Sequence, residues 1–84
     1  MFRYDIINRL IEKYDYKTYL EIGIHDGGCF RRIKCENKVG VDPCPDVMGW
    51  EETTFKITSN DFFAQTKEKF DIIFIELKFL IIIE

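Results

Sequence analysis

The stretch that decides the fold is Tyr19-Leu20-Glu21-Ile22-Gly23-Ile24-His25-Asp26-Gly27-Gly28, where an apolar run passes straight into a glycine-rich turn. The run, residues 19–24, is short, contains β-branched and aromatic side chains, and is bounded by polar residues and glycine, which is typical of a buried strand. The four residues after it have the composition of a turn, and residues 29–33 are long enough for about one and a half helical turns. The stretch therefore predicts a strand, a turn and a helix in succession.

Three more strands are predicted downstream, at residues 39–42, 53–57 and 70–75. The first is stopped by prolines, the second alternates with period two, and the third is continuously apolar and is expected to be covered on both faces. One helix is predicted from an apolar stripe that recurs every four residues from Phe2 to Tyr14, and another from about residue 60 to 69 with Ser59 as its N-cap. Strands that alternate with helices in this way predict an α/β fold with a parallel sheet.

Length and composition set the scale of this fold. The 84 residues are 46% hydrophobic and 32% charged, so the chain has enough apolar surface for a core. At roughly 150 residues per domain it amounts to about half a domain, and no internal repeat or linker interrupts it. We therefore expect one folding unit over residues 1–84, made of a leading helix (1–16), an α/β core (17–76) and an apolar tail (77–84).

The charge and the cysteines argue against several classes of protein. The net charge of −3 offers no electrostatic footprint for nucleic acid or an anionic membrane, and the most apolar stretch, residues 70–83, falls short of the ~20 residues of a membrane span. No signal peptide is predicted at Met1. The three cysteines, at 29, 35 and 44, lack metal-site spacing, and His25 is the only histidine. We therefore expect no bound metal, and three reduced thiols in a cytoplasmic protein.

Polar residues at the ends of the predicted strands form the candidate binding site. In parallel sheets ligands bind beyond the carboxyl ends of the strands, and the first strand ends in the pattern E-x-G-x-x-x-G, formed by Glu21, Gly23 and Gly27. Asp42 ends the second strand about twenty residues after Glu21, the spacing at which an acid binds both hydroxyls of an adenosine ribose. Taken singly, each feature has a plainer explanation, as a tight turn or as a turn acid before proline.

A third group of polar residues follows the predicted strand at 53–57. Asn60 or Asp61 has the reach to bind an adenine amine there, and Phe62 the position to border the ring. The alternative is that Ser59 caps the helix while Phe62 and Phe63 are buried in the core. Three such features in the same order at consecutive strand ends are more informative than any one of them.

In these segments the sequence resembles the class I S-adenosylmethionine-dependent methyltransferases, particularly the type-24 group that acts on small molecules. The matching segments are 19–28, 39–43, 58–63 and 70–76, and the resemblance covers roughly residues 17–76, the N-terminal, cofactor-binding half of a family domain. It implies a Rossmann-like fold, here truncated to about four mainly parallel strands flanked by helices. It also implies an enzyme that transfers a methyl group from S-adenosylmethionine to a small acceptor, whose identity stays open.

The resemblance further implies which residues hold the cofactor. The loop that carries its methionine part maps onto Glu21, Gly23, Asp26 and Gly27, the acid that holds the ribose maps onto Asp42, and the residues that touch adenine map onto Asn60, Asp61 and Phe62. Glu76, at the end of the last family-like strand, is in a position to approach the cofactor. Glu76 and His25 are available as bases, but no catalytic residue is assigned.

Beyond Glu76 the sequence departs from the family. Where the group has an aspartate followed by glycine, a hydrophobic residue and histidine, this chain has Glu76-Leu77-Lys78-Phe79, and only four of the family's seven strands are found. The strand at 70–75 is then expected to be an open sheet edge, beside an aggregation-prone apolar tail. We expect two chains to pair through Phe70–Ile83 as a homodimer. The alternative is that the tail folds back on its own chain as an added strand or helix.

Two functions of different classes follow from these expectations. One is an S-adenosylmethionine-dependent methyltransferase, or a subunit of one. The other is a non-catalytic half-domain that persists as a small dimeric α/β protein with at most residual nucleoside binding. An altered reading frame after Glu76 is compatible with the abrupt change of pattern, and a redox or metal protein is a further alternative.

Overall fold

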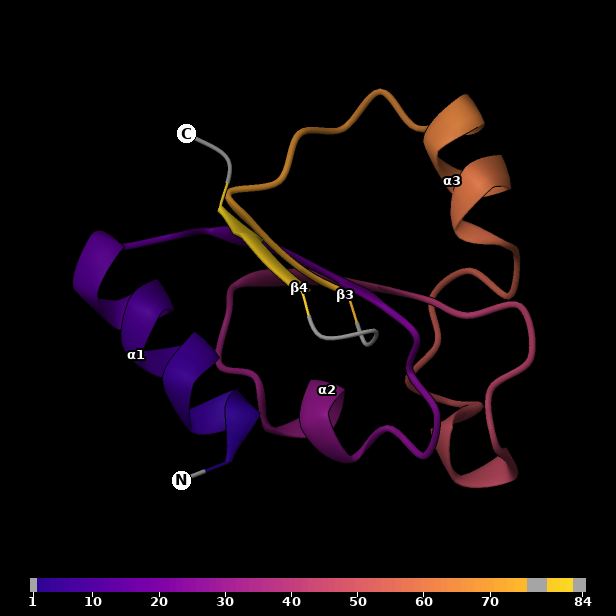
Figure 1. Ribbon diagram of the computed structural model, residues 1–84, viewed down its shortest axis with the longest axis horizontal. Helices are drawn as coiled ribbons and strands as arrows, with labels where there is room; N and C mark the ends of the chain where they lie inside the picture. The colour runs from indigo at the N-terminus through magenta and orange to yellow at the C-terminus, as the bar shows by residue number, and fades with distance from the viewer. Residues whose placement is uncertain (1, 76–78, 83–84) are drawn as a thin grey trace.

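The computed structural model describes residues 2–75 and the backbone of residues 79–82 (Figure 1). The elements in chain order are α1 (Arg3–Tyr14), β1 (Thr18–Ile22), α2 (Gly28–Arg32), β2 (Asn37–Val41), the 3-10 helix η1 (Val47–Gly49), α3 (Ser59–Gln65), β3 (Ile72–Ile75) and β4 (Phe79–Ile82). Within this part of the chain no helix is long and apolar enough to cross a membrane.

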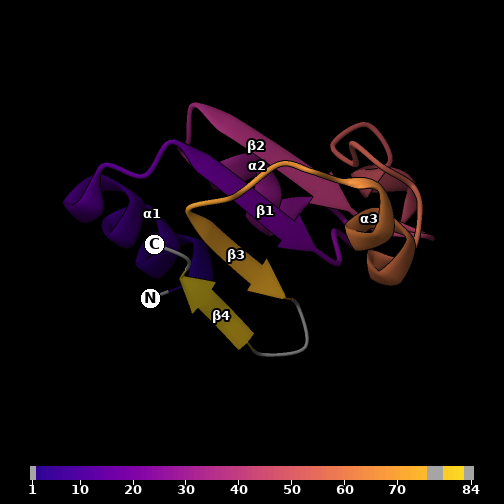
Figure 2. The same cartoon turned by 90° about the horizontal axis from the view of Figure 1, so that it is seen from above.

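The four strands form one sheet in the order β2-β1-β3-β4 (Figure 2). The first three run parallel, with Leu20 of β1 opposite Val39 of β2 and Ile73 of β3, whereas β4 runs antiparallel to β3. The prediction of an α/β fold with a parallel sheet is therefore confirmed, with three parallel strands and one antiparallel strand.

Helices cover both faces of the parallel strands. On one face, α1 and α2 pack a cluster of buried residues against β1 and β3: Ile7, Ile11, Tyr19, Ile24, Phe30, Ile33, Ile72 and Phe74. On the other face, Phe62 of α3 joins a second cluster with Leu20, Val41, Phe70 and Ile73. Because consecutive strand residues point to opposite faces, Ile73 and Phe74 of β3 belong to different clusters, as the continuous apolar run at 70–75 predicts.

The predicted third strand, at 53–57, is wrong as a strand. Only a single parallel bridge forms there, between Val41 and Phe55. The N–H groups of Thr54 and Phe55 both donate to the carbonyl of Gly40, at 2.9 and 3.0 Å, while the Gly40 N–H donates to the Thr54 hydroxyl. Two consecutive donors on one carbonyl, and a side chain in place of a backbone acceptor, interrupt the regular ladder that a strand needs.

The boundaries of α3 also differ from the prediction. Thr58, rather than Ser59, is the N-cap, and its hydroxyl accepts a hydrogen bond of 3.1 Å from the Asp61 N–H. The helix ends at Gln65 instead of residue 69, since Thr66 is already extended. The Thr66 hydroxyl accepts from the N–H of Glu68 at 3.2 Å. Such a local side-chain bond gives the backbone an alternative to another helical turn.

The tail supplies the fourth strand of the sheet. Residues 79–82 pair with β3, with Phe79 opposite Ile75 and Ile82 opposite Ile72. The expected open edge at 70–75 is therefore wrong, because β4 occupies it, and the alternative of a tail that folds back as an added strand is confirmed for these residues. The edge strand on this side of the sheet is β4. The expectation of a homodimer through Phe70–Ile83 remains a prediction.

Candidate functional site

The site lies at the carboxyl ends of the parallel strands, beside the point where the chain reverses its direction across the sheet. From β1 the chain passes through α2 to β2 on one side, and it later returns through α3 to β3 on the other side of β1. Phe30 of α2 and Phe62 of α3 belong to the clusters on opposite faces. Ligands of open α/β sheets bind at such a reversal, outside the carboxyl ends of the strands.

The turn after β1 is held in left-handed backbone conformations. Gly23 has φ 89°, His25 has φ 53° and Gly27 has φ 79°, a region in which glycine carries no steric penalty. The Gly23 N–H donates to the carbonyl of Val41 at 2.8 Å, and the Gly27 N–H donates to that of Ile24 at 2.9 Å. The glycines at 23 and 27 are thus explained by the path of the backbone as well as by any ligand.

Asp42 joins the end of β2 to this turn. Its Oδ2 accepts hydrogen bonds from the N–H groups of Ile24 and His25 at 2.9 and 3.0 Å, and its Oδ1 accepts from the N–H of Cys44 at 2.9 Å. Burial acts to raise the pKa of this carboxyl, but the amides of His25, Cys44 and Ile24 outweigh it and lower the pKa. A carboxylate has about four acceptor positions, so an ionised Asp42 keeps one on Oδ1.

Glu21 has its partners inside the protein. Its side chain is 1% exposed, and it accepts a 2.6 Å hydrogen bond from the Tyr19 hydroxyl, on the face of β1 that α1 and α2 cover. Burial, and then the charge of Glu21, raise the pKa of Tyr19 well above its usual value. Burial and the Glu21 carboxylate likewise raise the pKa of the Cys29 thiol to about 12. Glu21 is thus a core acid in a small polar cluster.

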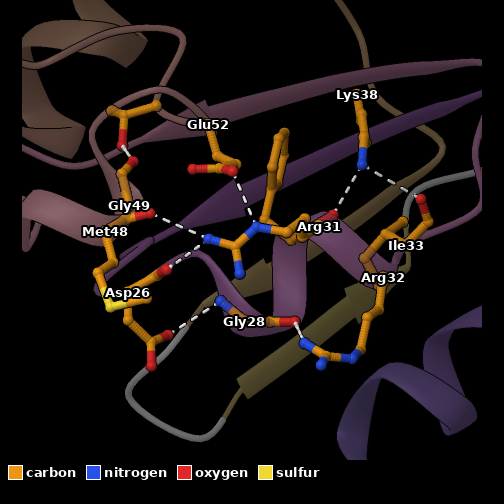
Figure 3. Close-up of polar contacts among 11 residues, drawn as sticks. Asp26, Gly28, Arg31, Arg32, Ile33, Lys38, Met48, Gly49 and Glu52 are labelled. Atoms are coloured by element: carbon orange, nitrogen blue, oxygen red, sulfur yellow. Dashed lines mark hydrogen bonds and ion pairs between the residues drawn. The ribbon is translucent and has the colours of Figure 1, made fainter.

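Asp26 shapes the start of α2. Its Oδ1 accepts a hydrogen bond of 2.9 Å from the N–H of Gly28, two residues on. At the other end of the helix the Lys38 ammonium donates to the carbonyls of Phe30 and Ile33, at 2.8 and 3.3 Å (Figure 3). Both ends of this short helix are therefore tied to polar side chains.

Arg31 connects α2 to the segment around η1 (Figure 3). Its Nε donates to Glu52 Oε1 at 2.8 Å, and its terminal amino group donates to the carbonyls of Asp26 and Met48 at 2.8 and 3.0 Å. The hydrogen bond from Arg31 lowers the pKa of the Glu52 carboxyl. Neither residue was predicted from the sequence, because one polar residue on a short helix and one in a loop produce no periodic signal.

Three glycines lie where this segment approaches the turn. A Cβ built on Gly49 falls 1.9 Å from the carbonyl oxygen of His25, and one on Gly27 falls 3.1 Å from Glu52 Oε2. A Cβ on Gly40 falls 3.2 Å from the Glu52 carbonyl oxygen. The space that each glycine leaves is thus filled by a neighbouring segment of the chain. Gly49 was also missed from the sequence, since a lone glycine in a loop has no distinctive pattern.

The residues predicted for adenine separate in the structure. Asn60 and Asp61 lie exposed in the first turn of α3. Phe62 is 4% exposed and packs in the core cluster on the α3 face, which favours the alternative of core burial for this residue. Phe63 is 48% exposed, so the alternative holds for one phenylalanine and not for both. Glu76 lies outside the described residues.

A cavity adjoins the glycine-rich turn. It has a volume of about 640 Å³ and lies between the start of α1 and the start of α2. Its lining includes Asp26 of the turn, Arg3 and Tyr4 of α1, and Gly28 and Arg32 of α2. Of the residues predicted to hold the cofactor, Asp26 lines this cavity, whereas Glu21 is enclosed in the core.

The described residues contain no group of three or more histidine, cysteine, aspartate or glutamate side chains placed to hold a metal ion. His25, which was considered as a base, is exposed and lies in the turn with a left-handed backbone. Its N–H donates to Asp42, as described above. The structure thus gives His25 a backbone role in the turn.

Comparisons with known proteins returned no match: no family model fits the chain, and no curated protein or solved structure is significantly similar to it. The resemblance to methyltransferases therefore rests on the motifs of the chain itself.

Proposed function

We propose that this protein binds S-adenosylmethionine at the carboxyl ends of β1 and β2, as a methyltransferase-like α/β domain. The observation that carries the proposal is the direct contact between Asp42 and the glycine-rich turn, through the amides of Ile24 and His25. An acid after the second strand and a glycine turn after the first are the two parts with which doubly wound domains hold an adenosine moiety. Here they are hydrogen-bonded to each other.

The strand order supports a Rossmann-like fold for the proposed domain. At the end of β2, the Val41 carbonyl points toward the turn after β1 and accepts from Gly23, whereas the Gly40 carbonyl points the other way and accepts from Phe55. The bridge at Phe55 therefore lies on the outer side of β2. The order bridge-β2-β1-β3 corresponds to the first four positions, 3-2-1-4, of the doubly wound sheet.

Each part of the ligand has a proposed partner. The remaining acceptor position of Asp42 binds a ribose hydroxyl, the turn at Gly23 and Gly27 gives the backbone close access to the methionine part, and exposed Asn60 and Asp61 are available to adenine. When bound, S-adenosylmethionine supplies an electrophilic methyl group, and transfer depends chiefly on aligning it with the acceptor and excluding water. No base is assigned, and the acceptor is an unidentified small molecule.

Calorimetric titration with S-adenosylmethionine and with S-adenosylhomocysteine tests the proposal. Asp42→Asn should weaken binding by about tenfold or more, because it replaces a charged acceptor. Asp46→Asn is the matched control, since it removes an exposed acid from the same loop and should leave the affinity unchanged. Asp61→Asn tests the adenine contact away from the turn. A folded wild-type protein that gives no binding heat with millimolar cofactor overturns the proposal.

A second candidate function is that of a non-catalytic dimeric α/β protein. It is favoured by the composition of β4, the edge strand beside β3. The four residues of β4, Phe79–Ile82, include no charge and no proline, the devices with which proteins protect an edge strand from pairing. We propose that a second copy pairs antiparallel along β4 in a two-fold arrangement. Sedimentation velocity over a range of concentrations tests this, and a clean monomer at every concentration contradicts it.

A matched pair of lysine variants locates the interface. Ile81→Lys places a charge in the middle of β4 and should shift the protein to monomer. Val47→Lys makes the same change at the first residue of η1, which is 88% exposed, and should leave association unchanged. A dimer that binds the cofactor yet transfers no methyl group to any acceptor tested supports this candidate over the enzyme. The three unpaired thiols are in keeping with a cytoplasmic location for either candidate.

A further inference from the structure

We propose that residues 46–52, here called the η1 strap, close over the glycine-rich turn and that Arg31 latches them shut. The strap rests on contacts within the chain, and only its effect on ligand binding rests on the function proposed above. The latch is the three-way contact of the Arg31 guanidinium shown in Figure 3. It joins the turn, through the Asp26 carbonyl, to the strap, through the Met48 carbonyl and Glu52.

The strap touches the turn backbone to backbone. The Asp46 N–H donates to the carbonyl of His25 at 3.0 Å, and Gly49 comes so close that a Cβ there falls 1.9 Å from the same oxygen and 3.0 Å from the Gly27 nitrogen. The closed strap thus covers the backbone of His25 and Gly27. A ligand that approaches this backbone has to displace the strap.

The apolar side chains of the strap contribute little to its packing against the turn. Val47, Met48 and Trp50 are 88%, 69% and 51% exposed, and the buried residue at the contact, Gly49, has no side chain. A segment with few buried apolar contacts opens at low free-energy cost. The closed position therefore depends mainly on hydrogen bonds and on the Arg31–Glu52 ion pair, for which water substitutes readily.

Glu52 adds a reason for the strap to open. Its Oε1 is bound to Arg31, but its Oε2 is buried and has no hydrogen-bond partner among the residues that the structure describes. A buried unpaired acceptor is unfavourable, and exposure to water removes the penalty. The same residue that completes the latch thus also opposes full closure, as expected of an element with two accessible positions.

Amide hydrogen exchange and quenching of Trp50 fluorescence test the latch without any ligand. Trp50 is the only tryptophan, so its quenching by acrylamide reports the strap directly. Arg31→Met removes the guanidinium and keeps an apolar stem of similar length. It should speed exchange at Asp46 and Gly49 on the order of five- to tenfold and increase quenching. The Gly23 amide, which bonds to β2, should exchange at the wild-type rate.

Arg32→Met is the matched control. It removes the same charge from the same helix, but Arg32 donates to the carbonyl of Gly28 and lies over the ring of Tyr4, away from the strap. This variant should leave the exchange of Asp46 and Gly49 unchanged. Glu52→Met removes the acceptor of the Arg31 hydrogen bond and so opens the latch from the strap side. Its exchange rates test the proposal if Arg31→Met does not fold. Wild-type exchange at Asp46 and Gly49 in a folded latch variant overturns the proposal, as does an equal effect of Arg32→Met.

Titration with S-adenosylhomocysteine links the strap to the ligand. If the closed strap competes with the ligand, Arg31→Met should bind several-fold more tightly, because a larger fraction of the protein is open. Equal or weaker binding by a variant with faster exchange contradicts this competition. If neither protein binds the ligand, the function proposed above fails, while the exchange rates still decide whether Arg31 latches the strap.

Discussion

The hydroxyl of Tyr19 donates a 2.6 Å hydrogen bond to the carboxylate of Glu21, two residues along the same strand. Both side chains are fully buried, so the first acid of the glycine-rich motif belongs to the core. A buried polar group needs such a partner inside the protein. Glu21 of the motif therefore stabilises the folded protein, whether or not the motif binds a ligand.

Tyr19→Phe should lower the free energy of unfolding by about 1.5–3 kcal/mol, because it leaves a buried carboxylate with one fewer donor. Urea denaturation followed by circular dichroism measures the change. Tyr14→Phe is the control, since Tyr14 is 49% exposed and its hydroxyl should contribute little. Equal stability of the two variants would show that Glu21 finds another donor at no cost.

Asp42 should make the protein sensitive to acid. Its folded-state pKa lies below the ordinary value, so its stabilising effect is complete above the unfolded-state pKa of about 4 and is lost as the pH falls through the folded-state value. Denaturation curves at a series of pH values should show wild-type stability falling more steeply below about pH 4 than that of Asp42→Asn. Parallel slopes for wild type and Asp42→Asn would contradict the amide contacts.

Phe62 and Phe63 provide a neighbouring pair with opposite surroundings. Phe62→Ala should cost about 3–5 kcal/mol, as expected for a large residue lost from a core, because Phe62 packs with Leu20 and Val41. Phe63→Ala should cost far less, since Phe63 is 48% exposed. Thermal unfolding of both variants measures the difference. A small effect at Phe62 would return this residue to the role of bordering a ligand.

The thiols should differ in reactivity toward Ellman's reagent at pH 8. Burial raises the pKa of Cys29 to about 12, and the thiolate is the reacting form, whereas Cys44 is exposed. In variants that keep one of these cysteines and replace the others by serine, Cys44 should react at least tenfold faster than Cys29. Rapid reaction of Cys29 in the folded protein would show that its cluster with Glu21 opens easily.

The parts of the fold that were predicted correctly are those with a local signal. The strand before the turn and the apolar strand at 70–75 were identified because each run is too short for a typical helix and is rich in β-branched and aromatic side chains, which favours a strand. The strand predicted at 53–57 failed because its alternation of polar and apolar residues does not say whether a neighbouring strand offers free donors and acceptors. Ser59 failed as the cap because Thr58, one residue earlier, has a hydroxyl that serves equally well.

For the site, the sequence by itself determined the chemical inventory: a glycine turn directly after a buried strand, an acid at the end of the next strand, and polar residues at the start of α3. These features can be predicted because they depend on residue types and short spacings along the chain. The tertiary structure alone decided the partners of each group. Glu21 turns into the core, Asp42 binds the turn through its amides, and Gly49 and Arg31 bring the strap onto it, because contacts between residues far apart in the chain depend on how the layers pack and leave no local pattern.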